Sequence, residues 1–353
     1  MNYPKEIRID KFTVSPRHPP FIIAELSGNH NQSFERAICI VKAAAKAGVH
    51  AVKLQTYTAD TMTIDMDKKE FVIQDRKSLW YGKSLFQLYQ QAQTPWEWHK
   101  PIFEYCRELG VACFSTPFDA TAVDFLEKLN VPAYKIASPE IVDLPLISQI
   151  ASTGKPIIIS SGMARLSELE DAVKTARKGG CKDIILLKCT STYPTDPIDS
   201  NILTIQNLID TFDVQVGLSD HTLGIGAAIA SVALGATVIE KHITLNRSDG
   251  GVDSAFSMEP DEFALLVKES QQAWKSLGKI QYGPTKSEET SLRFRRSLYI
   301  VEDMQKGDVL TQKTLRSIRP GFGLAPKNYM DLLGKRINSD ISKGTPMSWE
   351  YVD

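Results

Sequence analysis

The stretch AYKIASPEIVDLPLISQIASTGKPIIISSG, residues Ala133–Gly162, decides the fold of this chain. It begins and ends with apolar runs of strand length, AYKIAS (Ala133–Ser138) and PIIISSG (Pro156–Gly162). Such near-continuous apolar runs are typical of parallel strands that are buried on both faces. Between them Leu144–Ala151 has a helical pattern, and Gly154 follows where glycine adopts the left-handed helix cap without steric cost. The stretch therefore predicts a strand, a helix and a second strand parallel to the first.

The same pattern of a strand followed by a helix recurs along most of the chain. Six further strand-length runs are FIIAEL (Phe21–Leu26), AVKLQT (Ala51–Thr56), ACFSTP (Ala112–Pro117), IILLKC (Ile184–Cys189), VQVGLSD (Val214–Asp220) and TVIEKHI (Thr237–Ile243). The other helical segments are Ser33–Ala47, Pro95–Leu109, Ala120–Leu129, Ser167–Arg177, Leu203–Thr211, Gly224–Leu234 and a stretch from about Asp261 to Leu277. Eight strands that each precede a helix predict an α/β fold, the closed (β/α)8 TIM barrel. An open doubly wound sheet also alternates, but it rarely needs eight units.

Three segments depart from this repeat. Tyr57–Thr94 is a long polar and aromatic connection with little periodicity, which is typical of a lid or a binding loop. Ile280–Ser291 has the composition of a linker, and Leu292–Asp353 has short alternating strands and many turns. We therefore predict a barrel over residues 1–279, a linker over 280–291 and a small domain over 292–353, which is too short for a large core of its own.

Charge and cysteine content exclude several classes of function. The chain has 41 Lys and Arg against 42 Asp and Glu, so no global field attracts it to nucleic acid or to a membrane. No apolar run approaches the roughly 20 residues of a membrane span, and the charged start MNYPKEIRIDKF is unlike a signal peptide. Five scattered cysteines without a CxxC pair indicate neither a disulfide framework nor a zinc knuckle. We expect a cytoplasmic protein that binds neither nucleic acid nor membrane.

Two histidines follow the last two predicted strands, at the catalytic face of a TIM barrel. His221 comes just past the seventh strand, and His242 lies near the end of the eighth. Because adjacent barrel strands are about 4.8 Å apart, the two imidazoles can converge on one metal ion and leave positions open for water and substrate. The alternative is that one or both histidines only form hydrogen bonds within the barrel mouth.

Two lysines, Lys53 and Lys135, lie on predicted strands, where a buried ammonium group is costly unless an anion pairs with it. A phosphate or carboxylate ligand would be such an anion. Four strand-end hydroxyl groups would assist in binding it: Thr116, Ser138, Ser160 and Ser219. Two alternatives stay open: the lysines pair with a barrel acid such as Glu25 or Glu240, or Lys135 forms a Schiff base as in class I aldolases.

Glu25 ends the first predicted strand and precedes the polar sequence SGNHN (Ser27–Asn31). A carboxyl group at that position suits a general acid or base. The alternative is a structural ion pair with a barrel lysine.

The motifs that carry these residues resemble the sialic acid synthase family over nearly the whole chain. They occur in the family's order: FIIAELSGNHN (Phe21–Asn31), AVKLQTY (Ala51–Tyr57), FSTPFD (Phe114–Asp119), AYKIASPE (Ala133–Glu140), IISSGM (Ile158–Met163), CTSTYPT (Cys189–Thr195), GLSDHT (Gly217–Thr222) and IEKHIT (Ile239–Thr244). The C-terminal segment, with IRPGFGLAP (Ile318–Pro326), is similar to the family's antifreeze-like (SAF) domain. So many motifs in one order are far more specific than any one of them.

The resemblance implies a condensation of phosphoenolpyruvate with an N-acetylated amino sugar in its open aldehyde form, with release of phosphate. It implies that His221 and His242 bind a divalent metal ion (Mn, Mg or Co). For this chemistry we expect Lys53 and Lys135 to be catalytic, with Glu25 as the group that transfers a proton. The residues that match phosphoenolpyruvate contacts are Lys53, Thr116, Lys135, Ser138, Ser160 and Ser219, with Gln55, Tyr193 and Asp253 near the reacting molecules.

Arg319 matches the arginine that, in this family, reaches into the partner's active site and contacts the N-acetyl group of the sugar. The resemblance therefore implies a domain-swapped homodimer.

Several details favour the branch of the family that makes pseudaminic acid. They are LSGNHN (Leu26–Asn31), KLQTYTADTMT (Lys53–Thr63) and GGVDSAFSMEP (Gly250–Pro260), and Ser191 replaces the family's asparagine. The expected acceptor is 2,4-diacetamido-2,4,6-trideoxy-L-altrose. The alternatives are an N-acetylneuraminate or legionaminate synthase, a Schiff-base lyase that uses Lys135, and a carbohydrate-binding protein on an inactive barrel.

Overall fold

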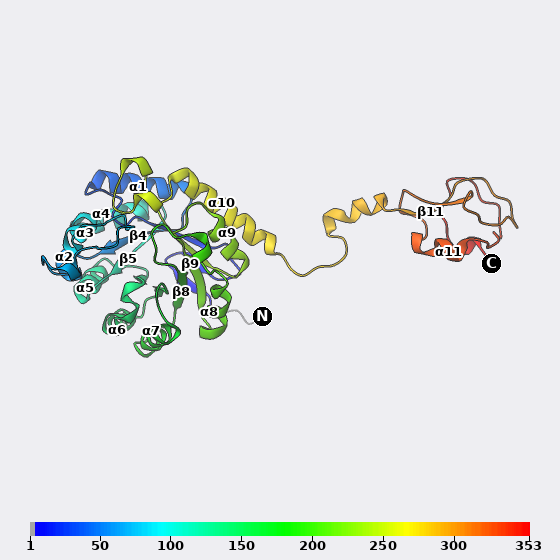
Figure 1. The fold of residues 1–353 in the computed structure, drawn as a ribbon. Helices are drawn as coiled ribbons and strands as arrows, with labels where there is room; N and C mark the ends of the chain where they lie inside the picture. The colour runs from blue at the N-terminus through cyan, green and yellow to red at the C-terminus, as the bar shows by residue number, and fades with distance from the viewer. Residues whose placement is uncertain (1–3) are drawn as a thin grey trace. The chain divides into compact units, whose positions relative to one another are not determined.

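Eight parallel strands close into a barrel in the computed structural model, which describes residues 4–353 (Figure 1). The order around the barrel is β10-β3-β4-β5-β6-β7-β8-β9. The strands are β3 (Phe21–Glu25), β4 (Ala51–Thr56), β5 (Ala112–Pro117), β6 (Tyr134–Ile136), β7 (Ile157–Ser160), β8 (Ile184–Cys189), β9 (Gln215–Ser219) and β10 (Val238–His242). The last strand pairs with the first in a register that sets His242 beside Glu25. The predicted TIM barrel is confirmed.

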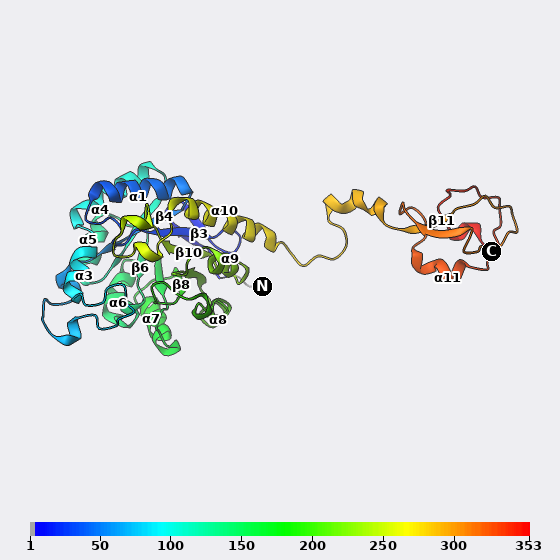
Figure 2. The same ribbon diagram turned by 45° about the horizontal axis from the view of Figure 1, so that its top comes forward.

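Helices surround the barrel on its outside (Figure 2). They are α1 (Phe34–Ala47), α4 (Trp96–Glu108), α5 (Ala120–Lys128), α6 (Leu144–Ser152), α7 (Leu166–Lys178), α8 (Thr204–Phe212), α9 (Gly226–Ala233) and α10 (Pro260–Leu277). Their ends follow local chemistry: Ser33 caps α1 by accepting a hydrogen bond from the Arg36 amide, and Gly48 ends it with φ at 88°. Among residues 4–353, no helix is long and apolar enough to cross a membrane.

The alternation of side chains along each strand creates two apolar cores. Outward-facing residues such as Ile22 and Leu54 pack against the helices in the larger core. Inward-facing residues at the amino ends of the strands, such as Phe21 and Ala51, form the smaller core inside the barrel. The inner core fills only this end of the barrel and leaves the carboxyl ends of the strands to polar side chains.

An N-terminal hairpin, which the sequence analysis did not predict, completes the inner core. Strands β1 (Ile7–Ile9) and β2 (Phe12–Val14) pair antiparallel, and their buried side chains Ile7, Ile9 and Val14 join the inner core. The Gln215 side-chain amide donates to the Pro4 and Lys5 carbonyl oxygens. The sequence signal for this hairpin was the alternation of apolar and charged residues in IRI (Ile7–Ile9). Three residues are too few to predict a strand from such alternation.

The connection Tyr57–Thr94, predicted to lack sustained periodicity, contains two short helices. They are α2 (Ala59–Met62) and α3 (Leu85–Ala92), with a 3-10 turn at Lys69–Phe71 between them. At the start of α3, Ser84 and Gln87 form a reciprocal capping box. This capping signature was the local signal for α3, and helices this short give little periodicity.

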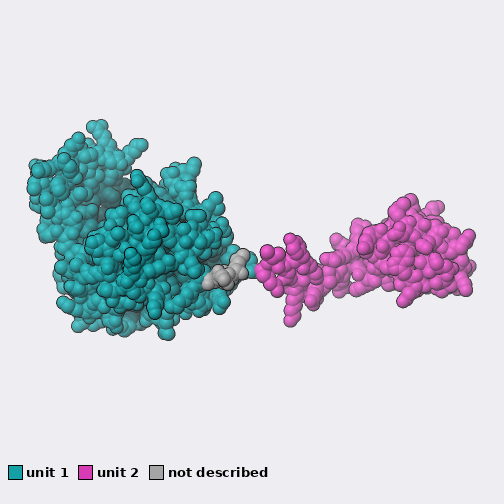
Figure 3. All heavy atoms as spheres, turned by 90° about the horizontal axis from the view of Figure 1, so that it is seen from below, with its two compact units in different colours: residues 1–278 teal, residues 279–353 magenta. Residues whose placement is uncertain are grey.

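The chain divides into two compact units, residues 1–278 and residues 279–353 (Figure 3). In the second unit, β11 (Ser297–Ile300) and β12 (Leu315–Ile318) pair antiparallel, and α11 (Tyr329–Leu332) follows. Leu298, Leu315 and Leu332 belong to an apolar core of its own. A 3-10 helix over Lys286–Phe294 begins within the predicted linker. The predicted domain limits stay a prediction.

Candidate active site

The polar site begins where the inner core ends. In β3, Phe21 and Ile23 belong to the inner core, and the next inward-facing residue is Glu25. In β6, Lys135 follows Ala133 in the same way, and in β10 Glu240 follows Val238. Because inward-facing positions recur every second residue, each apolar strand adds one or two polar groups at its carboxyl end. This is the catalytic face of a TIM barrel.

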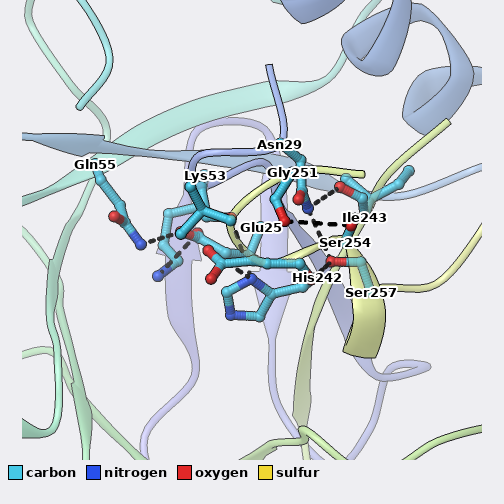
Figure 4. A network of polar contacts seen from close by, with 12 residues as sticks. Glu25, Asn29, Lys53, Gln55, His242, Ile243, Gly251, Ser254 and Ser257 are labelled. Carbon is cyan, nitrogen blue, oxygen red and sulfur yellow. Dashed lines mark hydrogen bonds and ion pairs between the residues drawn. The ribbon is translucent and has the colours of Figure 1, made fainter. Parts of the chain in front are cut away.

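Lys53 is the centre of a buried ionic network with two carboxylates (Figure 4). Its Nζ lies 2.9 Å from Glu25 Oε2 and 3.2 Å from Glu240 Oε1. The Gln55 side-chain amide donates to Glu25 Oε1 at 2.9 Å. Lys135 Nζ donates to Ser160 Oγ at 2.6 Å and lies 3.9 Å from Glu240 Oε1. Both lysines are thus balanced by barrel carboxylates, the pairing that the sequence analysis left open.

Burial and pairing shift the pKa values of this network in opposite directions. Burial raises the pKa of Glu25 to about 7 although the Lys53 ammonium opposes it. Burial lowers the pKa of Lys135 to about 8, against the attraction of Glu240. For Glu240, burial is outweighed by Lys135 and Lys53, which lower its pKa. Glu25 is therefore poised to exchange a proton near neutral pH, whereas Glu240 stays ionised.

His221 and His242 lie close together in the wall of the cavity. Their ring centroids are 5.3 Å apart, and both side chains line the same cavity. His221 Nδ1 lies 3.0 Å from the Thr190 carbonyl oxygen, and His242 Nδ1 lies 3.3 Å from Ser27 Oγ. Burial lowers the pKa of His242 well below its usual value, which keeps that imidazole neutral.

This arrangement fits two ligands of a divalent metal ion. Metal-binding histidines usually fix one ring nitrogen with a hydrogen bond and bind the ion with the other, as a neutral imidazole. Among residues 4–353, no group of three or more His, Cys, Asp or Glu side chains is arranged to hold a metal ion. Two protein ligands would leave several coordination positions for water and substrate.

Two of the four predicted hydroxyl groups, Thr116 and Ser160, contact the lysines directly. Thr116 Oγ1 accepts from Lys53 Nζ at 3.4 Å, and Ser219 Oγ donates to Glu240 Oε1 at 3.3 Å. Ser138 Oγ accepts from the Gly162 amide at 3.0 Å. A side chain at position 162 would overlap the Ser138 and Ser191 hydroxyl groups, so only glycine permits this close approach.

Residues from the connection 57–94 and from the segment after β10 cover the cavity. The Trp80 indole donates to the Val252 carbonyl oxygen at 2.9 Å, and its ring lies 5.8 Å from that of Tyr193. Asp253 Oδ2 lies 3.8 Å from His242 Nδ1. The Asn29 side-chain amide donates to the Ile243 carbonyl oxygen at 2.8 Å (Figure 4). The cavity has a volume of about 280 Å³, which suits small molecules.

Most of the residues predicted from the sequence line this one cavity. They are Glu25, Lys53, Gln55, Lys135, Ser138, Ser160, Tyr193, Ser219, His221, His242 and Asp253. Thr116 is buried beside Lys53, and Arg319 lies in the second unit.

Sequence reasoning missed other cavity residues, notably Tyr57, Trp80, Glu140 and Cys189. Strand alternation was the signal for Cys189, since Ile185 and Leu187 face inward before it. The tryptophan, in contrast, gave no periodic signal, because it lies between short helices.

The comparisons with known proteins agree with the family resemblance of the motifs. The chain matches the NeuB family over residues 40–282 and the SAF domain over residues 295–352. It is 44% identical to pseudaminic acid synthase from Helicobacter pylori, over 95% of this chain and 98% of that protein. It is 36% identical to N,N'-diacetyllegionaminic acid synthase from Legionella pneumophila, over 94% of each protein.

A solved structure gives the same result for the fold. The N-acetylneuraminic acid (sialic acid) synthetase from Leptospira borgpetersenii superposes with a TM-score of 0.74 at 32% identity, over 84% of this chain and 98% of that chain. The resemblance to sialic acid synthases is therefore confirmed, and the chain belongs to the NeuB family.

Proposed function

We propose that this chain condenses phosphoenolpyruvate with the open-chain aldehyde of an N-acetylated amino sugar and releases phosphate by C–O cleavage. Family membership implies both substrates. The observation that carries the proposal is the buried group of Lys53, Lys135, Glu25 and Glu240, which lines the same cavity as two imidazoles with ring centroids 5.3 Å apart. Its lysines suit a phosphate and a carboxylate, and its poised carboxyl group suits proton transfer at an aldehyde oxygen.

Each group has a defined task in the proposed reaction. The enol carbon of phosphoenolpyruvate attacks the aldehyde carbon, and the Glu25 carboxyl gives its proton to the aldehyde oxygen as that oxygen gains charge. Water then adds to the resulting oxocarbenium carbon and gives one proton back to the Glu25 carboxylate. The tetrahedral intermediate collapses to the keto acid as the C–O bond to phosphate breaks, and its hydroxyl proton leaves with the phosphate. Lys53 and Lys135 hold the phosphate and stabilise its departure. His221 and His242 would hold a divalent ion (Mn, Mg or Co), which supplies Lewis-acid polarisation of a carbonyl oxygen when bound; members of the family are generally metal-dependent.

The acceptor that we propose is 2,4-diacetamido-2,4,6-trideoxy-L-altrose, with pseudaminic acid as the product. The higher identity to the Helicobacter protein than to the Legionella protein, 44% against 36%, supports this choice. Ser191, in place of the family's asparagine, lies against Gly162 close to Ser138, which lines the cavity, and this supports a different sugar contact there.

Phosphate release measured with three different sugars tests the proposed acceptor. With phosphoenolpyruvate fixed, we expect kcat/KM for the altrose derivative to exceed that for N-acetylmannosamine by at least about 100-fold. The reason is that a site built for particular polar groups rejects analogues that leave those groups unpaired. The diacetamido sugar of legionaminic acid synthesis is the matched control, because it also carries two acetamido groups. Equal rates with the three sugars would contradict the acceptor assignment.

Arg319 is proposed to act in the site of a partner chain in a homodimer. We expect Arg319→Ala to raise the KM for the sugar about 10- to 100-fold, because a charged hydrogen bond to a substrate amide is lost, and to leave the KM for phosphoenolpyruvate unchanged. Co-expression of Arg319→Ala with His221→Ala shows whether Arg319 acts in the site of the partner chain or in the site of its own chain. A purified mixed dimer contains one intact site only if the arginine crosses to the partner, so activity well above either parent is expected. Absence of this recovery in a stable mixed dimer would contradict the swapped arrangement.

A further inference from the structure

Lys241 is a buried ammonium group for which the proposed reaction has no use. It lies between Glu240 and His242 on β10, and its side chain is 1% exposed. Because side chains alternate along a strand, Lys241 points away from the barrel interior that its two neighbours face. Burial lowers the pKa of Lys241, against the attraction of Asp220.

The Lys241 ammonium binds both residues that flank His221. Its Nζ lies 2.7 Å from Asp220 Oδ2 and donates to the Thr222 carbonyl oxygen at 2.8 Å. Asp220 Oδ1 accepts from the Thr222 amide at 2.9 Å, which closes a tight turn around the histidine. β9 ends at Ser219, and past this end the Thr195 amide donates to the His221 carbonyl oxygen at 3.0 Å. The Lys241 contacts add to this backbone hydrogen bond and act on the two residues on either side of the histidine.

We propose that Lys241 is a positioning residue that sets the separation and orientation of the two imidazoles. It ties the turn of His221 to the backbone position directly before His242, so one ammonium group connects both histidines. The inference rests on the proposed metal site at these histidines. A metal site needs its ligands held to within a few tenths of an ångström, and partners outside the ligand set provide this.

Variants that remove the charges of Lys241 and Asp220 distinguish a role in positioning the histidines from a role in stabilising the fold. Lys241→Met leaves the Asp220 carboxylate buried without its counter-charge, so we expect a lower melting temperature. In the double variant Asp220→Asn with Lys241→Met no charge is left unpaired, and the amide oxygen introduced at position 220 can still accept from the Thr222 backbone amide. We expect this protein to regain most of the melting temperature. It still lacks the ammonium that joins the two histidine segments.

The readout is the dissociation constant for Mn²⁺, measured by electron paramagnetic resonance on the full chain without substrates, together with the melting temperature. We expect both Lys241 variants to bind Mn²⁺ about 10- to 100-fold more weakly than the wild type. Arg247→Met is the control, because it breaks an ion pair with Glu262 in the segment after β10 and should leave Mn²⁺ affinity unchanged.

Each outcome decides the proposal. If the double variant regains wild-type Mn²⁺ affinity together with its stability, or if Lys241→Met binds Mn²⁺ as the wild type does, the positioning role is overturned. If Lys241→Met does not fold, the double variant alone decides. His221→Ala and His242→Ala are measured in parallel, and unchanged affinity in both would overturn the histidine site and the positioning role with it.

Discussion

Replacing His221 by alanine is expected to lower kcat by about 1,000-fold or more and to weaken divalent-metal binding. The imidazole is one of two with ring centroids 5.3 Å apart in the cavity, and a bound ion contributes several kcal/mol of charge stabilisation at a reacting carbonyl oxygen. Phosphate release is the activity assay, and the metal content of the purified protein is the second measurement. We expect both to fall together in His221→Ala.

The control for this substitution is His50→Gln. The His50 side chain accepts from the Ile22 amide at 2.9 Å and lies outside the cavity, so metal affinity and turnover should stay near wild-type values. Full activity of His221→Ala in metal-free buffer would refute the ligand assignment.

The wild-type protein tests the alternative in which Lys135 forms a Schiff base. The lowered pKa of Lys135, about 8, leaves a fraction of its amine neutral, as an imine-forming lysine requires. Borohydride with pyruvate should nevertheless leave the mass of the wild-type protein unchanged, and chelation of metal should stop turnover reversibly. A trapped adduct on Lys135, with turnover insensitive to chelator, would establish the lyase mechanism instead.

Glu25→Gln is expected to lower kcat by about 100- to 10,000-fold, the range of a lost general acid. The pH profile carries the sharper test. Burial raises the pKa of Glu25 to about 7, so the carboxyl group is protonated and able to donate below pH 7. As the pH rises through 7 the donor is lost, and kcat/KM of the wild type should fall with an apparent pKa near 7. The Glu25→Gln protein should lack this alkaline limb.

Glu140 supplies a matched control because burial also raises its pKa to about 7 and it lines the same cavity. Glu140→Gln should keep the alkaline limb whatever its effect on rate. If the limb disappears in Glu140→Gln and persists in Glu25→Gln, the proton donor is Glu140 and the assignment of Glu25 is wrong.

Strand-end residues were predictable because their signal is local. In IEKHIT (Ile239–Thr244) and AYKIAS (Ala133–Ser138), charged residues interrupt apolar runs that can only be buried strands. A lysine or histidine there is costly without a partner, so its presence indicates a site. The covering segment 57–94 was different, because Trp80 binds the Val252 carbonyl oxygen across a separation of 172 residues. The pattern of apolar residues along the sequence does not predict such a contact.

The sequence by itself determined the barrel, the face that carries the site and most of its polar residues. These follow from repeats of apolar runs and from the rule that parallel strands bring their carboxyl ends together. Only the tertiary structure decided which charges meet. It gave Lys53 two carboxylate neighbours, Glu25 a pKa near 7 and Lys241 its hold on the turn around His221. The physical reason is that pairing energies and desolvation depend on distances of a few ångströms between strands far apart in the chain, and burial patterns along one strand do not contain those distances.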